Sequence, residues 1–284
     1  MEIKKVMVIG AGQMGGGIAQ VIAQAGIEVL LNDTYPEAID KRIAFIEKLL
    51  TKNVTKGRMT EEEKANTLAL IKPCKDLQEG KEADLVIEAI IENMDIKKEL
   101  LNKLSDILSD DAIYASNTSS LSITELATAY KDPTRVIGMH FFNPVPVMKL
   151  IELIRGISTS DETYEVVRDL GEKIGKTTVE IKDFPGFAVN RILIPMINEA
   201  INTLYTGVAS AEDIDNAMKL GANHPMGPLA LADFIGLDTI LSILNVLYEG
   251  FGDQKYAPSP LLVNYVRAGW LGVKSGKGFY DYSK

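Results

Sequence analysis

Two histidines, His140 and His224, are the side chains in this sequence suited to proton transfer near neutral pH. His140 ends an apolar run, 136–139, that has the pattern of a buried strand, and ligands of open α/β sheets bind at the carboxyl ends of such strands. His224 precedes a proline in a turn rich in Gly and Pro. We therefore expect His140 to be the proton carrier. The alternative is a histidine that only hydrogen-bonds backbone at a strand end.

A carboxylate, Glu152, is a candidate partner for His140. In the strand expected around 148–154, Glu152 falls on the same side as Leu150 and Ile154, and an acid on an apolar face needs a partner. A carboxylate bonded to one imidazole nitrogen fixes the tautomer and stabilises the cation that forms on proton uptake. The pair predicts a general base with its orienting acid. The alternative for Glu152 is an acid of an edge strand that faces water.

A glycine-rich turn follows the first apolar run, 6–9, and opens a helical pattern. Gly10 permits the tight turn, Gly12 lets the backbone approach a pyrophosphate, and Gly15 lets helix and strand pack closely. The N–H groups at the helix start then face the phosphates. The predicted dinucleotide site consists of the residues of this turn: Gly10, Gly12, Gln13, Met14 and Gly15. A βαβ turn without a ligand is the alternative.

An acid at the end of the next apolar run, Asp33, bears on the choice of cofactor. It lies about 18 residues beyond Gly15, where a carboxylate reaches the adenosine ribose hydroxyls. A 2′-phosphate there would meet like charge, and the nearest downstream cation, Arg42, is too far along a helix to be the usual phosphate partner. The sequence therefore favours NAD(H) over NADP(H). The alternative role of Asp33 is a helix N-cap before Pro36.

Two further polar positions are candidates for substrate contact. Ser119 follows the expected strand 112–116 within Asn-Thr-Ser-Ser, at the carboxyl edge of the sheet, where its hydroxyl can bond a substrate oxygen. Its alternative role is an N-cap before the helix expected over 121–129. Asn190 comes directly after the expected domain boundary and faces either the cleft or the solvent.

A lysine stripe follows Asp33 on one helical face: Lys41, Lys48, Lys52 and Lys56, with Arg42 and Arg58 nearby. Such a stripe can receive the phosphates of an anionic carrier. A solvated helix surface has the same pattern.

The elements that must position these residues alternate between strand and helix. Apolar runs at 3–9, 29–31, 83–87 and 112–116 alternate with helical patterns near 36–53 and 96–108. Further strand runs at 136–140, 149–153 and 178–181 extend the sheet. The pattern predicts an α/β fold, a Rossmann-type doubly wound parallel sheet.

The periodicity changes after residue 184. Helical patterns follow at 188–205, 211–220, 229–248 and 260–268, with Gly and Pro between them. We therefore expect a dinucleotide-binding domain over 1–184 and an all-α C-terminal domain over 185–284. Because so few helices cannot bury both of their sides, we also expect a homodimer.

Composition limits the partners. With 46% hydrophobic residues the 284-residue chain can bury two cores, and its net charge of −9 disfavours nucleic acid. The single cysteine, Cys74, placed in a loop after Pro73, fits a reducing compartment. The chain starts almost directly with strand residues, and no apolar stretch is long enough to cross a bilayer. These features predict a cytoplasmic protein without a membrane partner, and no metal site is expected.

Several longer segments resemble the NAD-dependent 3-hydroxyacyl-CoA dehydrogenases over essentially the whole chain. They are VIGAGQMGGGIAQ at the start, EAIIEN at 88–93, SNTSSLSI from 116, GMHFFNPVPVMKLIE from 138, DFPGFAVNRIL from 183, DIDNAMKLGANHPMGP from 213 and the closing GKGFYDY. The segment from His140 to Glu152 is far more selective than the glycine turn.

The resemblance implies an activity and a set of residue roles. His140 is then the catalytic base and Glu152 its orienting acid, while Ser119 and Asn190 bond the reacting oxygen and the thioester region. Cofactor contacts are implied for Glu92, Lys97, Ser119, Asn143 and Lys274. Lys52 and, above all, Lys56 are implied to bind the coenzyme A tail.

The implied reaction is reversible hydride transfer between NAD(H) and a short-chain 3-hydroxyacyl-CoA, with acetoacetyl-CoA as the oxidised partner. It belongs to fatty acid and butanoate metabolism. The sequence leaves the direction of the reaction in the cell open.

Two other classes of function fit a nucleotide fold: a non-catalytic descendant, and a different dehydrogenase of the nucleotide-sugar or hydroxyacid type. A non-catalytic descendant has no reason to retain His140, Glu152, Ser119 and Asn190 together. A nucleotide-sugar dehydrogenase needs a nucleophilic cysteine late in the chain, whereas Cys74 is early, and a hydroxyacid dehydrogenase relies on a lysine of the helical domain.

Overall fold

The computed structural model describes residues 1–283 and divides the chain into two compact units, Met1–Phe184 and Pro185–Lys284. The first unit is built on an eight-stranded sheet of order β3-β2-β1-β4-β5-β6-β7-β8. Its strands are β1 (Lys5–Ile9), β2 (Glu28–Asn32), β3 (Ile71–Cys74), β4 (Leu85–Glu88), β5 (Ile113–Ser116), β6 (Val136–Phe141), β7 (Leu150–Arg155) and β8 (Thr177–Lys182).

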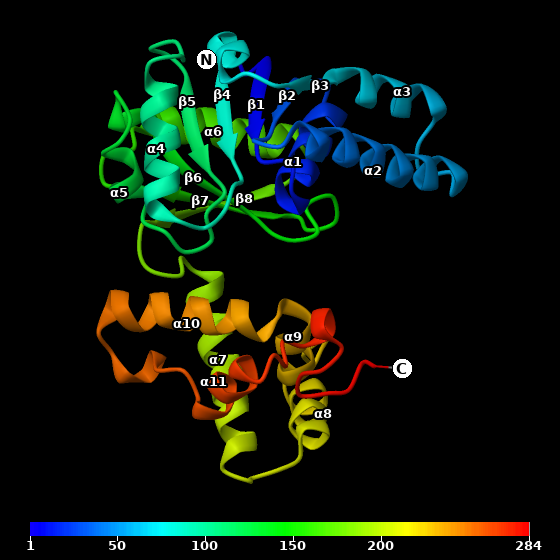
Figure 1. The fold of residues 1–284 in the computed structure, drawn as a ribbon, viewed down its shortest axis with the longest axis vertical. Helices are drawn as coiled ribbons and strands as arrows, with labels where there is room; N and C mark the ends of the chain where they lie inside the picture. The colour runs from blue at the N-terminus through cyan, green and yellow to red at the C-terminus, as the bar shows by residue number, and fades with distance from the viewer. Residues whose placement is uncertain (284) are drawn as a thin grey trace. The chain divides into compact units, whose positions relative to one another are not determined.

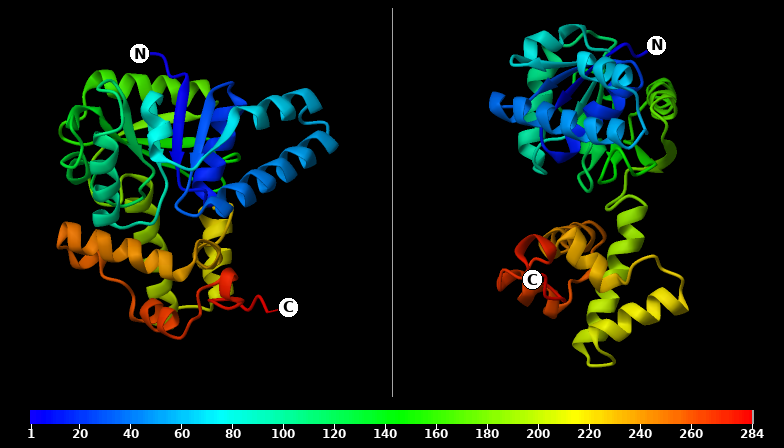
Figure 2. Two further views of the ribbon diagram at one scale, coloured as in Figure 1. Left: turned by 45° about the horizontal axis from the view of Figure 1, so that its top comes forward. Right: turned by 90° about the vertical axis from the view of Figure 1, so that its right-hand side faces the viewer.

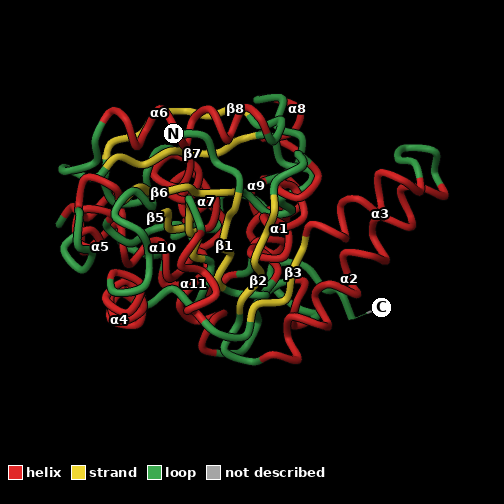
Figure 3. The backbone as a smooth tube through the Cα atoms, turned by 90° about the horizontal axis from the view of Figure 1, so that it is seen from above, coloured by secondary structure: helices red, strands yellow, loops and turns green. Residues whose placement is uncertain are grey.

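The helices of the first unit are α1 (Gln13–Gln24), α2 (Pro36–Thr55), α3 (Glu61–Leu70), α4 (Met94–Ser105), α5 (Ile123–Ala127) and α6 (Asp161–Lys173). The first six strands of the sheet, β3, β2, β1, β4, β5 and β6, are all parallel to one another. Strand β7 is antiparallel to β6, and β8 is parallel to β7. The strand direction turns steadily across the sheet, as Figure 3 shows. The predicted Rossmann-type sheet and its extension beyond a minimal nucleotide fold are confirmed, with β7 and β8 as a reversed pair.

Alternation along the strands separates the two faces of the sheet. Val6 and Val8 of β1, and Met139 of β6, belong to a buried core that includes apolar residues of α1, α2 and α6. The opposite face is covered by α4 and α5 (Figure 1). Because side chains alternate along a strand, His140 and Glu152 lie on this opposite face. On the same face, Ile123 of α5 packs close to Gly138, two residues before His140.

Helix α3, strand β3 and helix α6 of the first unit were missing from the sequence prediction. Helix α3 begins with a capping box between Thr60 and Glu63, and it leads directly into the edge strand β3. Cys74 therefore ends a strand and is buried, so its predicted position in a loop was wrong. Helices α2 and α3 form a hairpin that extends beyond this edge of the sheet (Figure 2). The proline in β3 and its short length hid the strand from periodicity, since an edge strand tolerates proline.

The second unit is helical, with α7 (Val189–Tyr205), α8 (Ala211–Gly221), α9 (Pro228–Ile235), α10 (Leu237–Phe251) and α11 (Pro260–Arg267). The prediction of a single helix over 229–248 was wrong. This segment forms two helices, α9 and α10, joined at Gly236, where φ is +104°. Within residues 1–283 no single helix is long and apolar enough to cross a membrane. Only α9 and α10 taken together have that length and composition, and they are bent by 97°. Buried apolar residues of all five helices form the core of this unit.

Candidate active site

The carboxyl ends of four neighbouring strands bring the candidate residues of the first unit to one edge of the sheet. The register aligns Ile9 with Glu88, Glu88 with Ser116, and Ser116 with Gly138. The glycine turn, the segment after β4, the segment after β5 and the end of β6 therefore follow the same edge. This is the position at which open α/β sheets bind their ligands.

His140 and Glu152 face each other across the antiparallel pair β6–β7. His140 Nδ1 lies 2.8 Å from Glu152 Oε2, and the two side chains are 8% and 0% exposed. A carboxylate only accepts, so Nδ1 carries the proton that the two atoms share and Nε2 is the nitrogen that can exchange a proton. The structure thus brings together the two residues that the sequence paired.

Two neighbours fix the surroundings of the imidazole. The ring of Phe142 lies 4.5 Å from that of His140, centroid to centroid, at a tilt of 45°. The backbone N–H of Phe141 donates to Asn117 Oδ1 over 2.9 Å. Asn117 therefore connects the end of the histidine strand to the segment that carries Ser119. Sequence reasoning did not single out Asn117, because its hydrogen-bond partner, Phe141, is at the end of another strand and the sequence does not show that the two residues meet.

The glycine turn has the geometry of a pyrophosphate cradle. Gly10 adopts φ +106°, and a Cβ on Gly15 would lie 1.8 Å from the carbonyl oxygen of Gly10. At Gly12 a Cβ would meet nothing within 4 Å, so the space in front of this residue is open. Helix α1 has no side-chain cap and no acid in its first turn, so its N–H groups suit phosphate oxygens. These residues fit a dinucleotide.

Asp33 connects β2 to the glycine turn. Its Oδ2 accepts a hydrogen bond from the Ala11 N–H over 2.7 Å and its Oδ1 accepts one from the Tyr35 N–H over 3.0 Å. The N-cap position of α2 is Tyr35, so the alternative role of Asp33 as that N-cap was wrong. A pocket beside Asp33 has apolar walls that suit an adenine ring, and charged side chains also line it. The apolar residues are Ile9, Pro36, Leu77, Ile90, Ile96 and Leu100, and the charged ones besides Asp33 are Lys75, Glu99 and Lys103.

Arg42 lies beside the glycine turn despite its distance along the chain. Its Nε–H donates to the Ala11 carbonyl over 2.9 Å, and burial lowers the pKa of its guanidinium. With Gln13, Lys41 and Phe45 it lines a pocket on the outer side of the turn. The expectation that Arg42 is remote was wrong, because α2 runs past the start of α1. The preference for NAD(H) rests on the carboxylate of Asp33.

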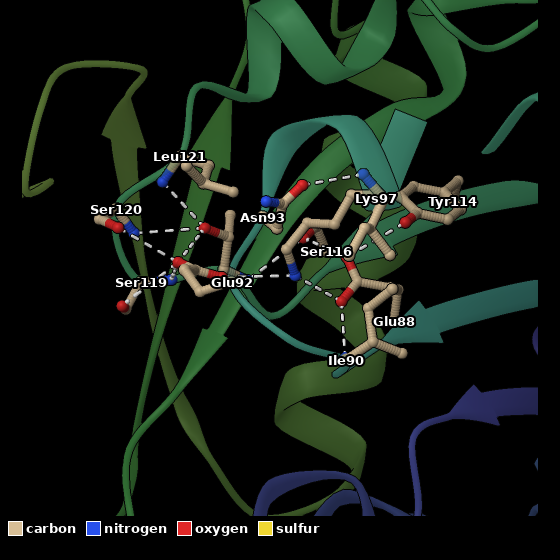
Figure 4. Close-up of polar contacts among 12 residues, drawn as sticks. Glu88, Ile90, Glu92, Asn93, Lys97, Tyr114, Ser116, Ser119, Ser120 and Leu121 are labelled. Carbon is tan, nitrogen blue, oxygen red and sulfur yellow. Dashed lines mark hydrogen bonds and ion pairs between the residues drawn. The ribbon is translucent and has the colours of Figure 1, made fainter. Parts of the chain in front are cut away.

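Glu92 and Lys97 belong to a polar cluster between β4, α4 and the segment after β5 (Figure 4). Lys97 Nζ lies 2.5 Å from Glu88 Oε1 and 3.4 Å from Glu92 Oε2. Glu92 Oε1 accepts hydrogen bonds from the Ser119 N–H over 2.9 Å and from the Thr118 hydroxyl over 2.6 Å. Sequence reasoning did not assign a role to Glu88. The only signal in the sequence was that an acidic residue ends an apolar strand.

Charge in this cluster favours an ionised Glu92. Burial raises the pKa of Glu92, but the positive charge of Lys97 and the hydrogen bonds from Thr118 and Ser119 outweigh it and hold the pKa below its ordinary value. The N-cap of α5 is Ser122, so the alternative role of Ser119 as an N-cap was wrong, and α5 begins at Ile123.

The remaining candidates of the first unit lie near the glycine turn or on α2. Asn143 accepts a hydrogen bond from the Gln13 side-chain amide over 2.9 Å, which connects the segment after His140 to the turn. Lys52 and Lys56 are exposed, the first in the last turn of α2 and the second at its C-cap.

The candidates of the second unit are described within that unit. Asn190 lies in the first turn of α7 and is buried, with 9% exposure. Lys274 Nζ forms an ion pair with Asp238 Oδ1 over 2.5 Å. His224 is half-buried, and its backbone N–H donates to the Met218 carbonyl in the turn after α8. Among residues 1–283 there is no group of three or more His, Cys, Asp or Glu side chains that could hold a metal ion.

Two family models match the chain. One, described as the NAD binding domain of 3-hydroxyacyl-CoA dehydrogenase, matches residues 5–184, and the other, described as the C-terminal domain of 3-hydroxyacyl-CoA dehydrogenase, matches residues 186–282.

Similar proteins cover the full length. A probable 3-hydroxybutyryl-CoA dehydrogenase of Bacillus subtilis is 58% identical over 284 residues, which are 100% of this chain and 99% of that protein. A 3-hydroxybutyryl-CoA dehydrogenase of Bradyrhizobium diazoefficiens is 55% identical and covers 99% of this chain and 96% of its own. The crystal structure of (S)-3-hydroxybutyryl-CoA dehydrogenase from Ralstonia eutropha superimposes with a TM-score of 0.98 at 50% identity, covering 100% of both chains.

Proposed function

The chain belongs to the 3-hydroxyacyl-CoA dehydrogenase family, and from this premise we propose that it is an NAD-dependent 3-hydroxybutyryl-CoA dehydrogenase. The reaction interconverts 3-hydroxybutyryl-CoA and NAD⁺ with acetoacetyl-CoA, NADH and a proton. Two relatives that carry this activity in their names are more than half identical to this chain over nearly its whole length.

The histidine–glutamate pair performs the proton transfer. In the oxidative direction neutral His140 accepts the proton of the 3-hydroxyl through Nε2, while the O–H electrons form the ketone and hydride leaves C3. Glu152 holds the Nδ1 proton and stabilises the imidazolium that results. In the reductive direction the protonated imidazole returns the proton to the developing alkoxide. The bound nicotinamide supplies the hydride acceptor or donor.

The other residues of the site bind and orient. The N–H groups at the start of α1 hold the pyrophosphate, and Asp33 accepts from the adenosine ribose hydroxyls. Ser119 and Asn190 bond the reacting oxygen and the thioester, Asn143 and Lys274 contact the cofactor, and Lys52 with Lys56 neutralises the phosphates of coenzyme A. Fixing substrate and cofactor relative to each other converts an encounter of two ligands into a local step.

The observation that carries this proposal is the buried 2.8 Å contact between His140 Nδ1 and Glu152 Oε2 at the ligand-binding edge of the sheet. The test is NADH oxidation, followed by absorbance, with acetoacetyl-CoA and with free acetoacetate. We expect rapid turnover only with the thioester, and at least an approximately hundredfold loss of kcat in His140→Ala with NADH binding retained. Equal rates with both substrates, or a fully active His140→Ala enzyme, would contradict the proposal.

We further propose a homodimer that acts in the cytoplasm. The second unit exposes large apolar side chains that a second copy would cover: Ile192, Val208, Leu220 and Phe234. The lone Cys74 accords with a reducing compartment. Sedimentation velocity at micromolar concentration should give a dimer, and a stable monomer would refute this assembly.

A further inference from the structure

Lys176 contacts the loop that separates the two residues of the proposed proton-transfer pair. This β6–β7 loop, residues 142–149, connects the strand of His140 to the strand of Glu152. Lys176 Nζ donates to the Val145 carbonyl over 2.5 Å and to the Met148 carbonyl over 2.7 Å. One ammonium group therefore joins two points of the loop, and the proposed mechanism does not use it.

The turn between α6 and β8 places Lys176 beside this loop. Gly175 ends the helix with φ +75°, and the backbone N–H of Lys176 donates to the Gly171 carbonyl over 3.0 Å. Strand β8 then runs parallel to β7, and the Thr177 N–H donates to the carbonyl of Lys149, the last residue of the loop, over 2.7 Å. The backbone of Lys176 is thus fixed next to the loop by a helix end and by strand pairing.

The partners of the Lys176 ammonium are backbone carbonyls rather than a carboxylate. Burial lowers the pKa of Lys176, and no acidic neighbour among residues 1–283 counteracts this effect. A partly buried cation needs compensating dipoles, and the two carbonyls supply them. Hydrogen bonds from a charged donor are about twice as strong as neutral ones. A neutral side chain at this position would leave both carbonyls without that donor.

The β6–β7 loop contacts the catalytic histidine and the dinucleotide helix. The Phe142 ring lies 4.5 Å from the His140 ring, centroid to centroid. Asn143 accepts a hydrogen bond from the Gln13 side-chain amide over 2.9 Å. Val145 is buried in the core that also contains residues of α1. A shift of the loop would therefore move groups at both the imidazole and the glycine turn.

We propose that Lys176 is a positioning residue, which holds the β6–β7 loop so that Phe142 and Asn143 keep the geometry needed for turnover. This inference rests on the proposed function. Lys176 acts through the loop carbonyls, and the loop acts through its contacts with His140 and Gln13. A displacement of about 1 Å in such groups lowers turnover. Strand pairing still holds His140 opposite Glu152, so loss of Lys176 should lower kcat without abolishing it.

The test is the substitution Lys176→Met, which keeps the length of the side chain and removes the donor. At saturating NADH and acetoacetyl-CoA we expect kcat per folded molecule to fall at least about fivefold. Lys176→Arg has N–H donors for both carbonyls, so it should restore most of kcat.

Amide hydrogen exchange, followed by mass spectrometry, reports on the loop independently of activity. The N–H groups of Val147 and Met148 donate to the Pro144 carbonyl over 2.9 and 3.0 Å. In Lys176→Met they should exchange at least about tenfold faster, because the loop opens more often. Peptides from β1 and β2 serve as the internal reference and should be unchanged.

Lys173→Met is the matched control. Lys173 is exposed in the last turn of α6, three residues before Lys176, so its substitution removes one cation from the same helix end. We expect its kcat and its loop exchange to equal those of the wild type. Since Lys176→Met leaves two carbonyls without a donor and can fail to fold, Lys176→Gln is measured in parallel. Its amide keeps N–H donors without the charge, so its kcat should lie between those of Lys176→Met and the wild type.

Several results would overturn the inference. Loop exchange at the wild-type rate in Lys176→Met, or in Lys176→Gln if only that variant folds, would show that Lys176 does not hold the loop. Faster exchange with unchanged kcat per folded molecule would leave the contact a purely structural role. An equal loss of kcat in Lys173→Met would assign the effect to charge at the helix end. Failure of the proposed function is distinguishable, because the wild type itself would then not reduce acetoacetyl-CoA, whatever the exchange rates.

Discussion

His140 and Glu152 are direct cross-strand partners in the antiparallel pair β6–β7, and their side chains meet at 2.8 Å between Nδ1 and Oε2 on the face of the sheet covered by α4 and α5. Reversal of β7 relative to β6 brings an acid that is 12 residues away in sequence directly opposite the histidine. Two strands thus fix the orientation of the imidazole.

Removing the charge of Glu152 should impair proton transfer more than binding. In Glu152→Gln the amide oxygen can still accept from Nδ1, but it no longer stabilises the imidazolium, so we expect kcat to fall by at least about tenfold with little change in the Kd of NADH. Steady-state kinetics and a fluorescence titration measure the two quantities.

Glu180→Gln is the matched control for Glu152→Gln, because it also removes one carboxylate charge from a neighbouring strand. Glu180 is on the adjacent strand β8 and forms a surface ion pair with Arg155. Its substitution should leave kcat within about twofold of the wild type, because exposed ion pairs contribute little. An equal loss of kcat in both variants would contradict the role assigned to Glu152.

Two glycines of the turn should respond differently to alanine. Gly12 has φ −67° and open space at its Cβ position, so Gly12→Ala should keep the melting temperature but raise the Kd of NADH by at least about tenfold, since the methyl occupies the pyrophosphate approach. Gly15→Ala places a Cβ 1.8 Å from the Gly10 carbonyl oxygen and should destabilise the fold by about 1–3 kcal/mol. Thermal unfolding and NADH titration of both variants give the comparison. The reverse pattern would be incompatible with the cradle.

The carboxylate of Asp33 should determine the preference between the two nicotinamide cofactors. Asp33→Asn removes the charge that repels a 2′-phosphate and keeps an oxygen that can accept from the Ala11 N–H. We expect the ratio of kcat/KM for NADH to kcat/KM for NADPH to fall at least about tenfold, equivalent to about 1.4 kcal/mol. An unchanged ratio would show that another feature selects the cofactor.

Cys74 should resist alkylation in the folded protein. It is buried at the end of β3, and burial, with the nearby charge of Glu79, raises the pKa of its thiol to about 11. At pH 8 only about one thiol in a thousand is then ionised, and the thiolate is the reacting form. Mass spectrometry should find iodoacetamide incorporated after unfolding in urea and almost none before. Labelling of the native protein at the rate of the unfolded chain would contradict this burial.

The sequence by itself determined the features that depend on local pattern. Strand and helix periods predicted the sheet and the helical unit, because each buried element must repeat its apolar residues at its own period. The alternation of β7 placed Glu152 on a defined face, and the spacing of the glycines predicted the turn that Gly10 and Gly15 form.

Only the tertiary structure decided which residues from distant segments meet. Arg42 returns to the glycine turn, Gly236 breaks a continuous apolar pattern into two helices, and Glu88 gathers its donors from β5 and α4. Sequence periodicity predicts helices and strands, but it does not predict these contacts, because each one forms where two separate elements pack together. The partner of a buried polar group is decided by that packing.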